Sequence, residues 1–139
     1  MSECIFCKIL SGKLPGSFVY QDEVCSAFLD IHPVNPGHVL VVPNRHVSRV
    51  VQLTDQESAH LLKVGREILK SIEKTDLRCE GVNFFISDGE PAGQDVLHTH
   101  LHIVPRFRGD GQQIGFVHSS SERDQLEDVA KKIKDGFDL

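Results

Sequence analysis

Three histidines occupy every second position of the segment His98-Thr99-His100-Leu101-His102. On a β-strand, successive side chains point to opposite faces and the chain rises about 3.3 Å per residue. The spacing therefore predicts three imidazoles on one face, spread over roughly 13 Å, with Leu101 and Ile103 turned toward the core. Because an imidazole can bind a metal, carry a proton or attack an electrophile, this segment is the main candidate for chemistry.

Three interpretations of these histidines stay open at this point. They can be ordinary surface or core residues, the ligands of a catalytic three-histidine zinc ion, or the surroundings of one nucleophilic imidazole. The loop that precedes them contains Gly89, Gly93 and Gln94, and a glycine-rich turn can direct backbone N–H groups at an anion. An anion beside imidazoles favours phosphoryl or nucleotidyl chemistry over proteolysis.

A pair of cysteines near the N-terminus forms a second candidate site. Cys4 and Cys7 have the two-residue spacing of a zinc half-site, and on a helix they share a face. A redox dithiol is one alternative, although no thioredoxin-like βαβ pattern surrounds the pair, and a chance pair is another. Cys25 and Cys79 have no partner spacing and are interpreted as small hydrophobic residues.

The hydrophobic pattern predicts the elements that must position these residues. We expect short strands over 17–21, 24–29, 38–42, 81–87 and 96–104, and a loop over 31–37. Helices are expected over 4–10, over 54–78 and from about 121 onward, the last with Leu126, Val129, Ala130, Ile133 and Phe137 on one face. This order predicts an antiparallel α+β domain rather than βαβ repeats.

One glycine interrupts the apolar stripe of the predicted long helix. Gly65 costs about 1 kcal/mol of helix stability relative to alanine. It indicates either a close backbone approach, such as that of a partner helix, or a tolerated defect.

Length and composition exclude several classes of protein. A chain of 139 residues predicts a single domain over 1–139, and 40% hydrophobic residues argue against disorder. The formal net charge of −5 argues against binding to nucleic acid or to an anionic membrane as the main activity. We expect no membrane span and no export signal, and hence cysteines that are reduced thiols or metal ligands in a cytoplasmic compartment.

The segment from Gly93 to Val104 resembles the signature of the histidine triad family, His-φ-His-φ-His-φ-φ with φ apolar. Thr99 is a mild departure at one φ position. The segments 28–31 and 36–43 resemble the nucleoside-facing part of that family, and the resemblance covers roughly Cys4 to Arg106 in unchanged order. The absence of tryptophan and the Pro105-Arg106 continuation are more similar to the bacterial and dinucleotide-hydrolase branches than to the phosphoramidase branch.

The resemblance implies a fold and an activity. The fold would be a five-stranded antiparallel sheet with a long helix and a C-terminal helix, in a homodimer. The activity would be that of a hydrolase or nucleotidyl transferase that cleaves purine nucleotide conjugates, such as dinucleoside polyphosphates or nucleoside phosphoramidates, at the α-phosphate.

The resemblance also implies a role for individual residues. His100 would attack the α-phosphorus through Nε2 and form a nucleotidyl-imidazole that water hydrolyses, while the carbonyl of His98 would hold the Nδ1 proton. His38 and His102 would contact the phosphate oxygens or the leaving group. The other substrate-binding residues that it implies are Phe28, Asp30 and Ile31 for the nucleoside, and Ser87, Gln94 and the N–H of Val96 for the phosphate.

Related zinc-containing proteins imply a metal site as well. Their ligand positions match Cys4, Cys7, His46 and His98 in this sequence. Such a closed Cys₂His₂ set has no position for water, so the zinc would be structural rather than catalytic. It would tie the N-terminal helix to the segment that carries His100.

Two departures from the family pattern support an alternative function. Ser87 stands where an asparagine is common, and Asp95 stands where several branches have a hydroxyl residue. Both weaken the expected phosphate cradle, so a nucleotide-binding sensor or adaptor with little turnover is the alternative.

Overall fold

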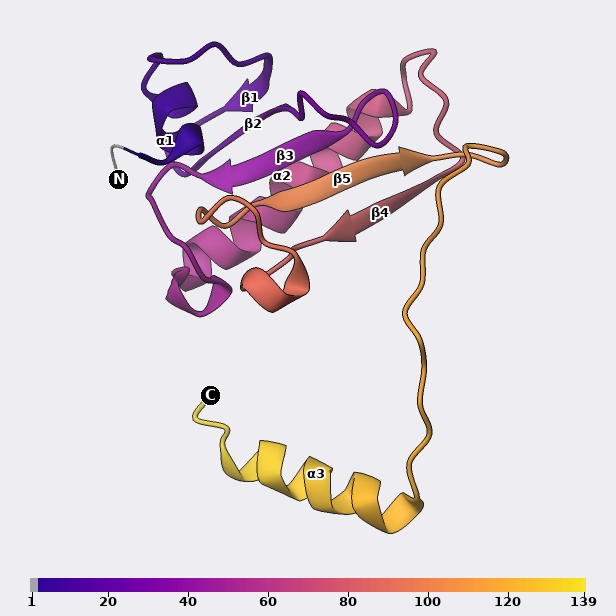
Figure 1. Ribbon diagram of the computed structural model, residues 1–139. Coiled ribbons are helices and arrows are strands. Elements are labelled where there is room, and N and C mark those ends of the chain that lie inside the picture. The colour runs from indigo at the N-terminus through magenta and orange to yellow at the C-terminus, as the bar shows by residue number, and fades with distance from the viewer. Residues whose placement is uncertain (1–2) are drawn as a thin grey trace.

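The computed structural model describes residues 3–139, which form one antiparallel sheet, two helices beside it and a third helix apart from it (Figure 1). The sheet order is β1-β2-β3-β5-β4, and every neighbouring pair is antiparallel. The predicted α+β class with a five-stranded sheet is therefore confirmed. The strands are β1 (Phe18–Gln21), β2 (Cys25–Leu29), β3 (Val39–Pro43), β4 (Gly81–Phe85) and β5 (Leu101–Arg106); the helices are α1 (Ile5–Leu10), α2 (Asp55–Ile72) and α3 (Arg123–Asp135), with 3₁₀ turns at Val50–Gln52 and Glu90–Ala92.

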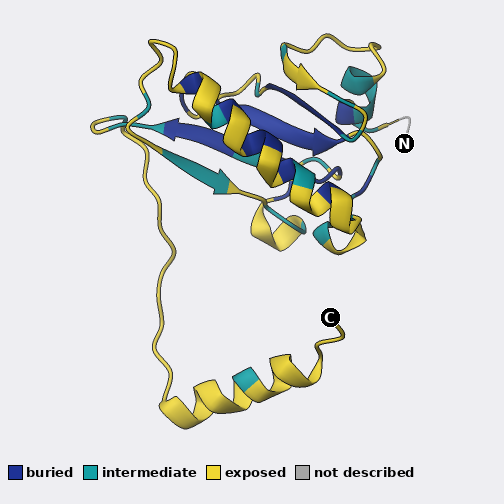
Figure 2. Cartoon of the chain, turned by 180° about the vertical axis from the view of Figure 1, so that it is seen from behind, coloured by how far each residue is buried: buried dark blue, intermediate teal, exposed yellow. Residues whose placement is uncertain are grey.

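Both faces of β3 are buried, so its residues contribute to two separate cores. Val39 and Val41 point to the face that α2 covers, as seen from behind in Figure 2, and pack there with Leu61, Val64 and Ile68 among others. Leu40 and Val42 point to the opposite face, where they pack with Phe6 of α1 and Phe28 of β2. The helix α1 therefore lies on the face of the sheet opposite to α2.

Helix α2 begins as predicted but ends earlier. Thr54 and Glu57 form the expected capping box at its start. The predicted end at residue 78 is wrong, because Thr75 donates both its N–H and its hydroxyl to the carbonyl of Ile72 and closes the helix there.

The close backbone approach expected at Gly65 is present, but the neighbour is the sheet of the same chain rather than a partner helix. A Cβ atom at this position would lie 3.0 Å from Phe84 Cε2 and 3.3 Å from Leu101 Cδ2. The glycine therefore allows α2 to pack closely on β4 and β5.

The strand that carries the histidines starts later than predicted. β5 begins at Leu101, so of the three histidines only His102 lies on a strand. In the register of Val41 with Leu101, residue 99 would pair with Pro43, which has no N–H to donate. Thr99 donates its N–H instead to the carbonyl of Val47. The predicted strand over 81–87 likewise ends early, at Phe85, which pairs with His102.

The C-terminal helix is amphipathic but makes no packed contact with the sheet. An extended segment leads away from β5 to α3, and every α3 side chain except that of Ala130 is exposed (Figure 2). Its apolar face includes Leu126, Val129 and Ile133, which are 45%, 52% and 60% exposed. Within the described part of the chain, every helix is too short or too polar to span a bilayer.

Candidate functional site

His100 points one nitrogen of its ring at a backbone carbonyl. Its Nδ1 atom lies 2.7 Å from the carbonyl oxygen of His98, and the residue is only 3% exposed. A carbonyl oxygen can only accept, so Nδ1 carries the ring proton and Nε2 keeps a lone pair when the ring is neutral. The backbone therefore holds His100 in the tautomer that a nucleophile at Nε2 requires.

His38 and His102 form a second imidazole pair whose tautomers follow from one backbone contact. The N–H of Val34 donates to Nδ1 of His38 at 3.0 Å, so the proton of neutral His38 is on Nε2. That Nε2–H group lies 2.9 Å from Nδ1 of His102 and donates to it. The proton of neutral His102 is consequently on Nε2, where it can donate to an anion beside His100.

Burial favours the neutral form of His38, His98 and His102. Loss of solvent is the largest cause that lowers the pKa of His102, to about 4, and the nearby His100 and His38 add to it. Burial also lowers the pKa of His38, against the opposing charge of Asp30, and that of His98. The tautomers assigned to His38 and His102 therefore hold at neutral pH.

Phe6 packs against the candidate nucleophile from α1. Its ring meets His100 edge to face, with centroids 5.0 Å apart, and His98 at 5.9 Å. On the other side of the site, Phe85 of β4 stacks on His102 with centroids 4.3 Å apart. Sequence reasoning missed both aromatic residues. The position of Phe6 between Cys4 and Cys7 was the available signal, since that helix was already expected to meet His98.

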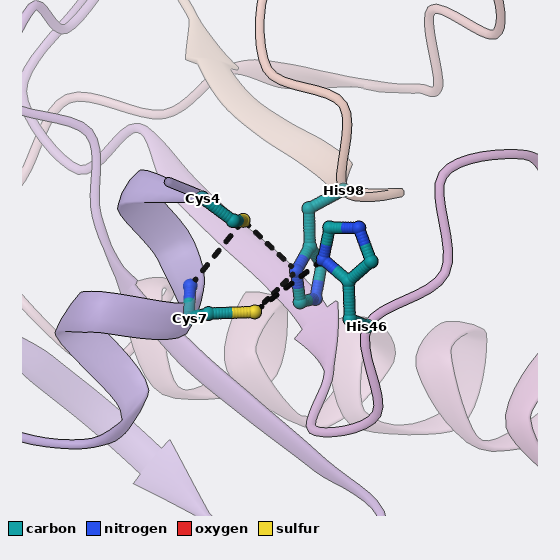
Figure 3. A group of neighbouring side chains, drawn as sticks. All are labelled: Cys4, Cys7, His46 and His98. Carbon is teal, nitrogen blue, oxygen red and sulfur yellow. Dashed lines mark hydrogen bonds between the residues drawn. The ribbon is translucent and has the colours of Figure 1, made fainter. Parts of the chain in front are cut away.

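The residues predicted to bind a metal converge (Figure 3). The ligand atoms of Cys4, Cys7, His46 and His98 all lie within 4.8 Å of one another. His98 donates Nε2–H to the carbonyl of Pro43 at 2.8 Å, which leaves the Nδ1 lone pair facing the two sulfur atoms. Nδ1 of His98 lies 3.5 Å from Cys4 Sγ and 3.6 Å from Cys7 Sγ, and Nδ1 of His46 lies 3.4 Å from Cys7 Sγ.

This geometry fits a tetrahedral zinc ion. Zinc bonds of about 2.0–2.3 Å separate the ligands by roughly 3.3–3.8 Å, as the sulfur–nitrogen distances do here. Burial is the largest cause that raises the pKa of the Cys7 thiol, and the neighbouring Cys4 adds to it. Without a cation the thiol is therefore favoured over the thiolate, whereas a bound metal ion would stabilise the thiolate form. The predicted alternative of a catalytic zinc ion on the three triad histidines has no such support, because within residues 3–139 His98, His100 and His102 form no common ligand set.

The glycine loop is held by Gln94 rather than by the sheet. Gly89 and Gly93 have φ angles of 96° and 94°, which favour glycine. The side chain of Gln94 accepts from the N–H of Gly89 at 2.7 Å and donates to the carbonyls of Ser48 and Val96 at 2.9 and 3.1 Å. Both amide hydrogens are thus occupied, which differs from the predicted donation by Gln94 to a phosphate.

The other residues predicted to hold the substrate differ in accessibility. The N–H of Val96 has no hydrogen-bond partner within residues 3–139, and Ser87 is half-buried beside the loop. Phe28 is buried against Phe6 with ring centroids 5.4 Å apart, so it is a core residue, whereas Ile31 is 85% exposed.

Asp30 and Asp95 lie beside His38 and His100. Oδ2 of Asp30 lies 3.6 Å from Nε2 of His38, and Oδ1 of Asp95 lies 4.0 Å from Nε2 of His100. Asp95 is thus close to the atom that would react.

Comparison of the sequence with known proteins identifies a family model and relatives that match this chain. A model of the HIT domain matches residues 11–109. An uncharacterised HIT-like protein of Methanocaldococcus jannaschii is 41% identical over 94% of this chain and 98% of its own length. The asymmetrical bis(5'-nucleosyl)-tetraphosphatase of Schizosaccharomyces pombe is 39% identical over 82% of this chain and 63% of its own length.

Solved structures of similar proteins share the fold over nearly the whole chain. A HIT family member from Bacillus subtilis has a TM-score of 0.87 and 35% identity over 99% of both chains. A zinc-bound histidine triad family protein from Mycobacterium smegmatis has a TM-score of 0.77 and 31% identity over 98% of this chain and 99% of its own. A histidine triad nucleotide-binding protein from Candida albicans has a TM-score of 0.85 and 28% identity over 96% of both chains. With its histidine motif, its five-stranded sheet and these relatives, the chain belongs to the HIT, or histidine triad, family.

Proposed function

We propose that this protein is a hydrolase or nucleotidyl transferase that cleaves purine nucleotide conjugates at the α-phosphate through a covalent bond to His100. The observation that carries the proposal is the 2.7 Å contact from His100 Nδ1 to the carbonyl of His98, which leaves the Nε2 lone pair available in a buried ring. The tetraphosphatase activity named for the S. pombe relative and the nucleotide binding named for the C. albicans protein support the substrate class.

The reaction would take two steps at phosphorus. Nε2 of His100 forms a bond to the α-phosphorus, and the bond from phosphorus to the leaving oxygen or nitrogen breaks. In this first step the leaving atom keeps the bond electrons and takes up a proton. In the second step water forms a new phosphorus–oxygen bond and the Nε2–phosphorus bond breaks. Water loses one proton in this step, which replaces the proton that the leaving group took up. The Nδ1–H bond to His98 stabilises the positive charge that the ring carries between the steps.

His102 would contact the phosphate, and His38 would act only through His102. The Nε2–H group of His102 would donate to a phosphate oxygen, together with the N–H of Val96. His38 is buried and bonded to His102, so it would position His102 rather than touch the phosphate. Gln94 would hold the glycine loop in shape.

The nucleoside would lie over the end of β2. Asp30 would bridge the ribose hydroxyls and the exposed Ile31 would cover the base, while Phe28 supports them from the core. Ser87 would supply a short hydroxyl donor near the loop.

We also propose a structural zinc ion on Cys4, Cys7, His46 and His98. When bound, zinc would supply a rigid crosslink and no chemistry in the reaction. The zinc-bound M. smegmatis protein supports this assignment. His98 has two functions in this account: its ring binds the metal while its carbonyl orients His100.

The exposed C-terminal helix supports a homodimer. The apolar face of α3 lies in solvent, and in a dimer of this family fold it would pack against a second copy of this chain. The B. subtilis structure superposes over 99% of the chain, which supports a helix α3 that also stands away from the sheet in that protein. Light scattering should give twice the mass of one chain, and a monomeric mass would contradict the dimer.

One substitution tests the reaction directly. His100→Ala should abolish turnover of adenosine 5'-phosphoramidate and of diadenosine polyphosphates while AMP binding stays within about threefold, because the ring supplies the bond and not the pocket. Retained turnover would end the proposal. The alternative, a nucleotide sensor, is favoured by the occupied amide of Gln94 and predicts a wild-type kcat near the uncatalysed rate with tight AMP binding.

A further inference from the structure

Asp95 is a charged group at the reacting nitrogen for which the mechanism above has no use. Its carboxylate oxygen Oδ1 lies 4.0 Å from Nε2 of His100. The side chain of Asp95 is 86% exposed and that of His100 only 3%, so the carboxylate stands at the mouth of the site. A phosphorus atom bonded to Nε2 would hold its leaving group within roughly 4–8 Å of this carboxylate.

Nothing cationic among the described neighbours offsets this charge. His38 and His102 are neutral at pH 7, because burial lowers their pKa values. Arg49, whose guanidinium lies next to Gly89, is held by Asp88 at 3.0 Å. The leaving-group side of the site therefore has a negative potential.

A cavity of about 340 Å³ opens beside Asp95. Its walls include Ile5, Val96 and Leu97, the proposed zinc ligands Cys4 and His46, and a second carboxylate, that of Glu3. No lysine or arginine lines it within residues 3–139. A leaving group that extends past Asp95 would meet these apolar side chains and the two carboxylates, which suit a short alkyl chain that ends in a positive charge.

We propose that Asp95 selects substrates by the charge of the leaving group. Nucleotides linked to an amine that carries a further positive charge are preferred over neutral conjugates, and conjugates with an anionic leaving group, such as a polyphosphate chain, are disfavoured. The inference rests on the proposed function and names the substrate class of the same site.

Coulomb's law sets the size of the effect. At a separation of about 6 Å and an effective dielectric constant of about 40–80, one unit of charge on the leaving group changes the rate or affinity about three- to tenfold. Conjugates that carry an ammonium or a carboxylate at the same position therefore differ in rate or affinity by about ten- to a hundredfold. Because Asp95 is exposed, salt near 1 M should remove most of this difference.

The experiment uses three adenosine 5'-phosphoramidates with linkers of equal length that end in an ammonium, a hydroxyl or a carboxylate group. The value of kcat/KM is measured for the wild type, for Asp95→Asn and for the control Asp76→Asn, which removes an exposed carboxylate in the loop after α2. For the wild type and for the Asp76→Asn control, kcat/KM should be highest for the ammonium conjugate, lower for the hydroxyl conjugate and lowest for the carboxylate conjugate. Asp95→Asn should bring the three values to within about threefold of one another, whatever common change the loss of the carboxylate causes in all three.

Binding separates this inference from the proposed function. The affinity of each conjugate is measured by calorimetry for His100→Ala with and without Asp95→Asn, so that no chemistry is needed. A charge preference that disappears with Asp95→Asn supports the inference even if the wild type hydrolyses none of the conjugates, which would refute the proposed function alone. Equal preference with and without the carboxylate, in rate or in affinity, overturns the inference.

Discussion

Phe6 connects the N-terminal helix to the candidate nucleophile, and its removal should cost both stability and rate. Its side chain is 6% exposed and contacts Phe28 and the rings of His98 and His100, at centroid distances of 5.0–5.9 Å. Truncation of a buried phenylalanine to alanine costs about 3–5 kcal/mol. For a domain of this size, we expect Phe6→Ala to lower the melting temperature by about 10–15 °C.

The milder Phe6→Leu keeps most of the packing and isolates the effect on chemistry. It should cost about 1–2 kcal/mol of unfolding free energy, and kcat should fall about tenfold because the His100 ring loses the edge that fixes it. Urea denaturation and steady-state turnover measure the two quantities with zinc present in excess.

Phe116→Ala is the matched control. That ring is 86% exposed, and its removal should change stability by less than about 0.5 kcal/mol. The reasoning would be refuted if Phe6→Ala also cost less than about 1 kcal/mol, because α1 would then not be packed on the triad segment.

Three further predictions concern the same region. Thr99→Val should stabilise the fold by about 1–2 kcal/mol in urea denaturation, because the buried Oγ1 of Thr99 has no hydrogen-bond partner within residues 3–139; a loss of stability would show that this hydroxyl is bonded. Cys7→Ser should abolish zinc content measured by atomic emission and lower the melting temperature, whereas Cys79→Ser should keep one zinc per chain; immediate loss of turnover on chelation would instead point to a catalytic metal. His102 should titrate near pH 4 in NMR spectra of its ring; because the unfolded chain binds that proton near pH 6.5, the His102 contribution to stability is present above about pH 6.5 and is lost as the pH falls toward 4. A midpoint near 6.5 would contradict the burial of that ring.

Local patterns in the sequence were sufficient for most of the fold. The hydrophobic pattern located β1, β2, β3 and β4 to within two residues at each end, and the capping box located the start of α2. β5 begins five residues later than the pattern predicts. The Cys4 and Cys7 spacing, together with the family resemblance, brought His46 and His98 into one ligand set, and the structure places all four together.

The features that the sequence did not predict depend on contacts between residues that lie far apart in the chain. The start of β5 depends on Pro43, a residue on another strand, and the packing of Gly65 depends on β4 and β5. The bond from His38 to His102 joins residues 64 positions apart, and it is the reason why we propose that His38 positions His102 instead of touching the phosphate. Gln94 was expected to donate to a phosphate, but its loop contacts satisfy it.

Detection of the covalent intermediate tests the account most directly. Wild-type protein is mixed with adenosine 5'-phosphoramidate, quenched within milliseconds and digested at neutral or alkaline pH, and the peptides are mapped by mass spectrometry. The account predicts one nucleoside monophosphate adduct on the peptide that contains His100, absent from His100→Ala. An adduct on another residue, or steady turnover with no adduct at any time, would contradict it.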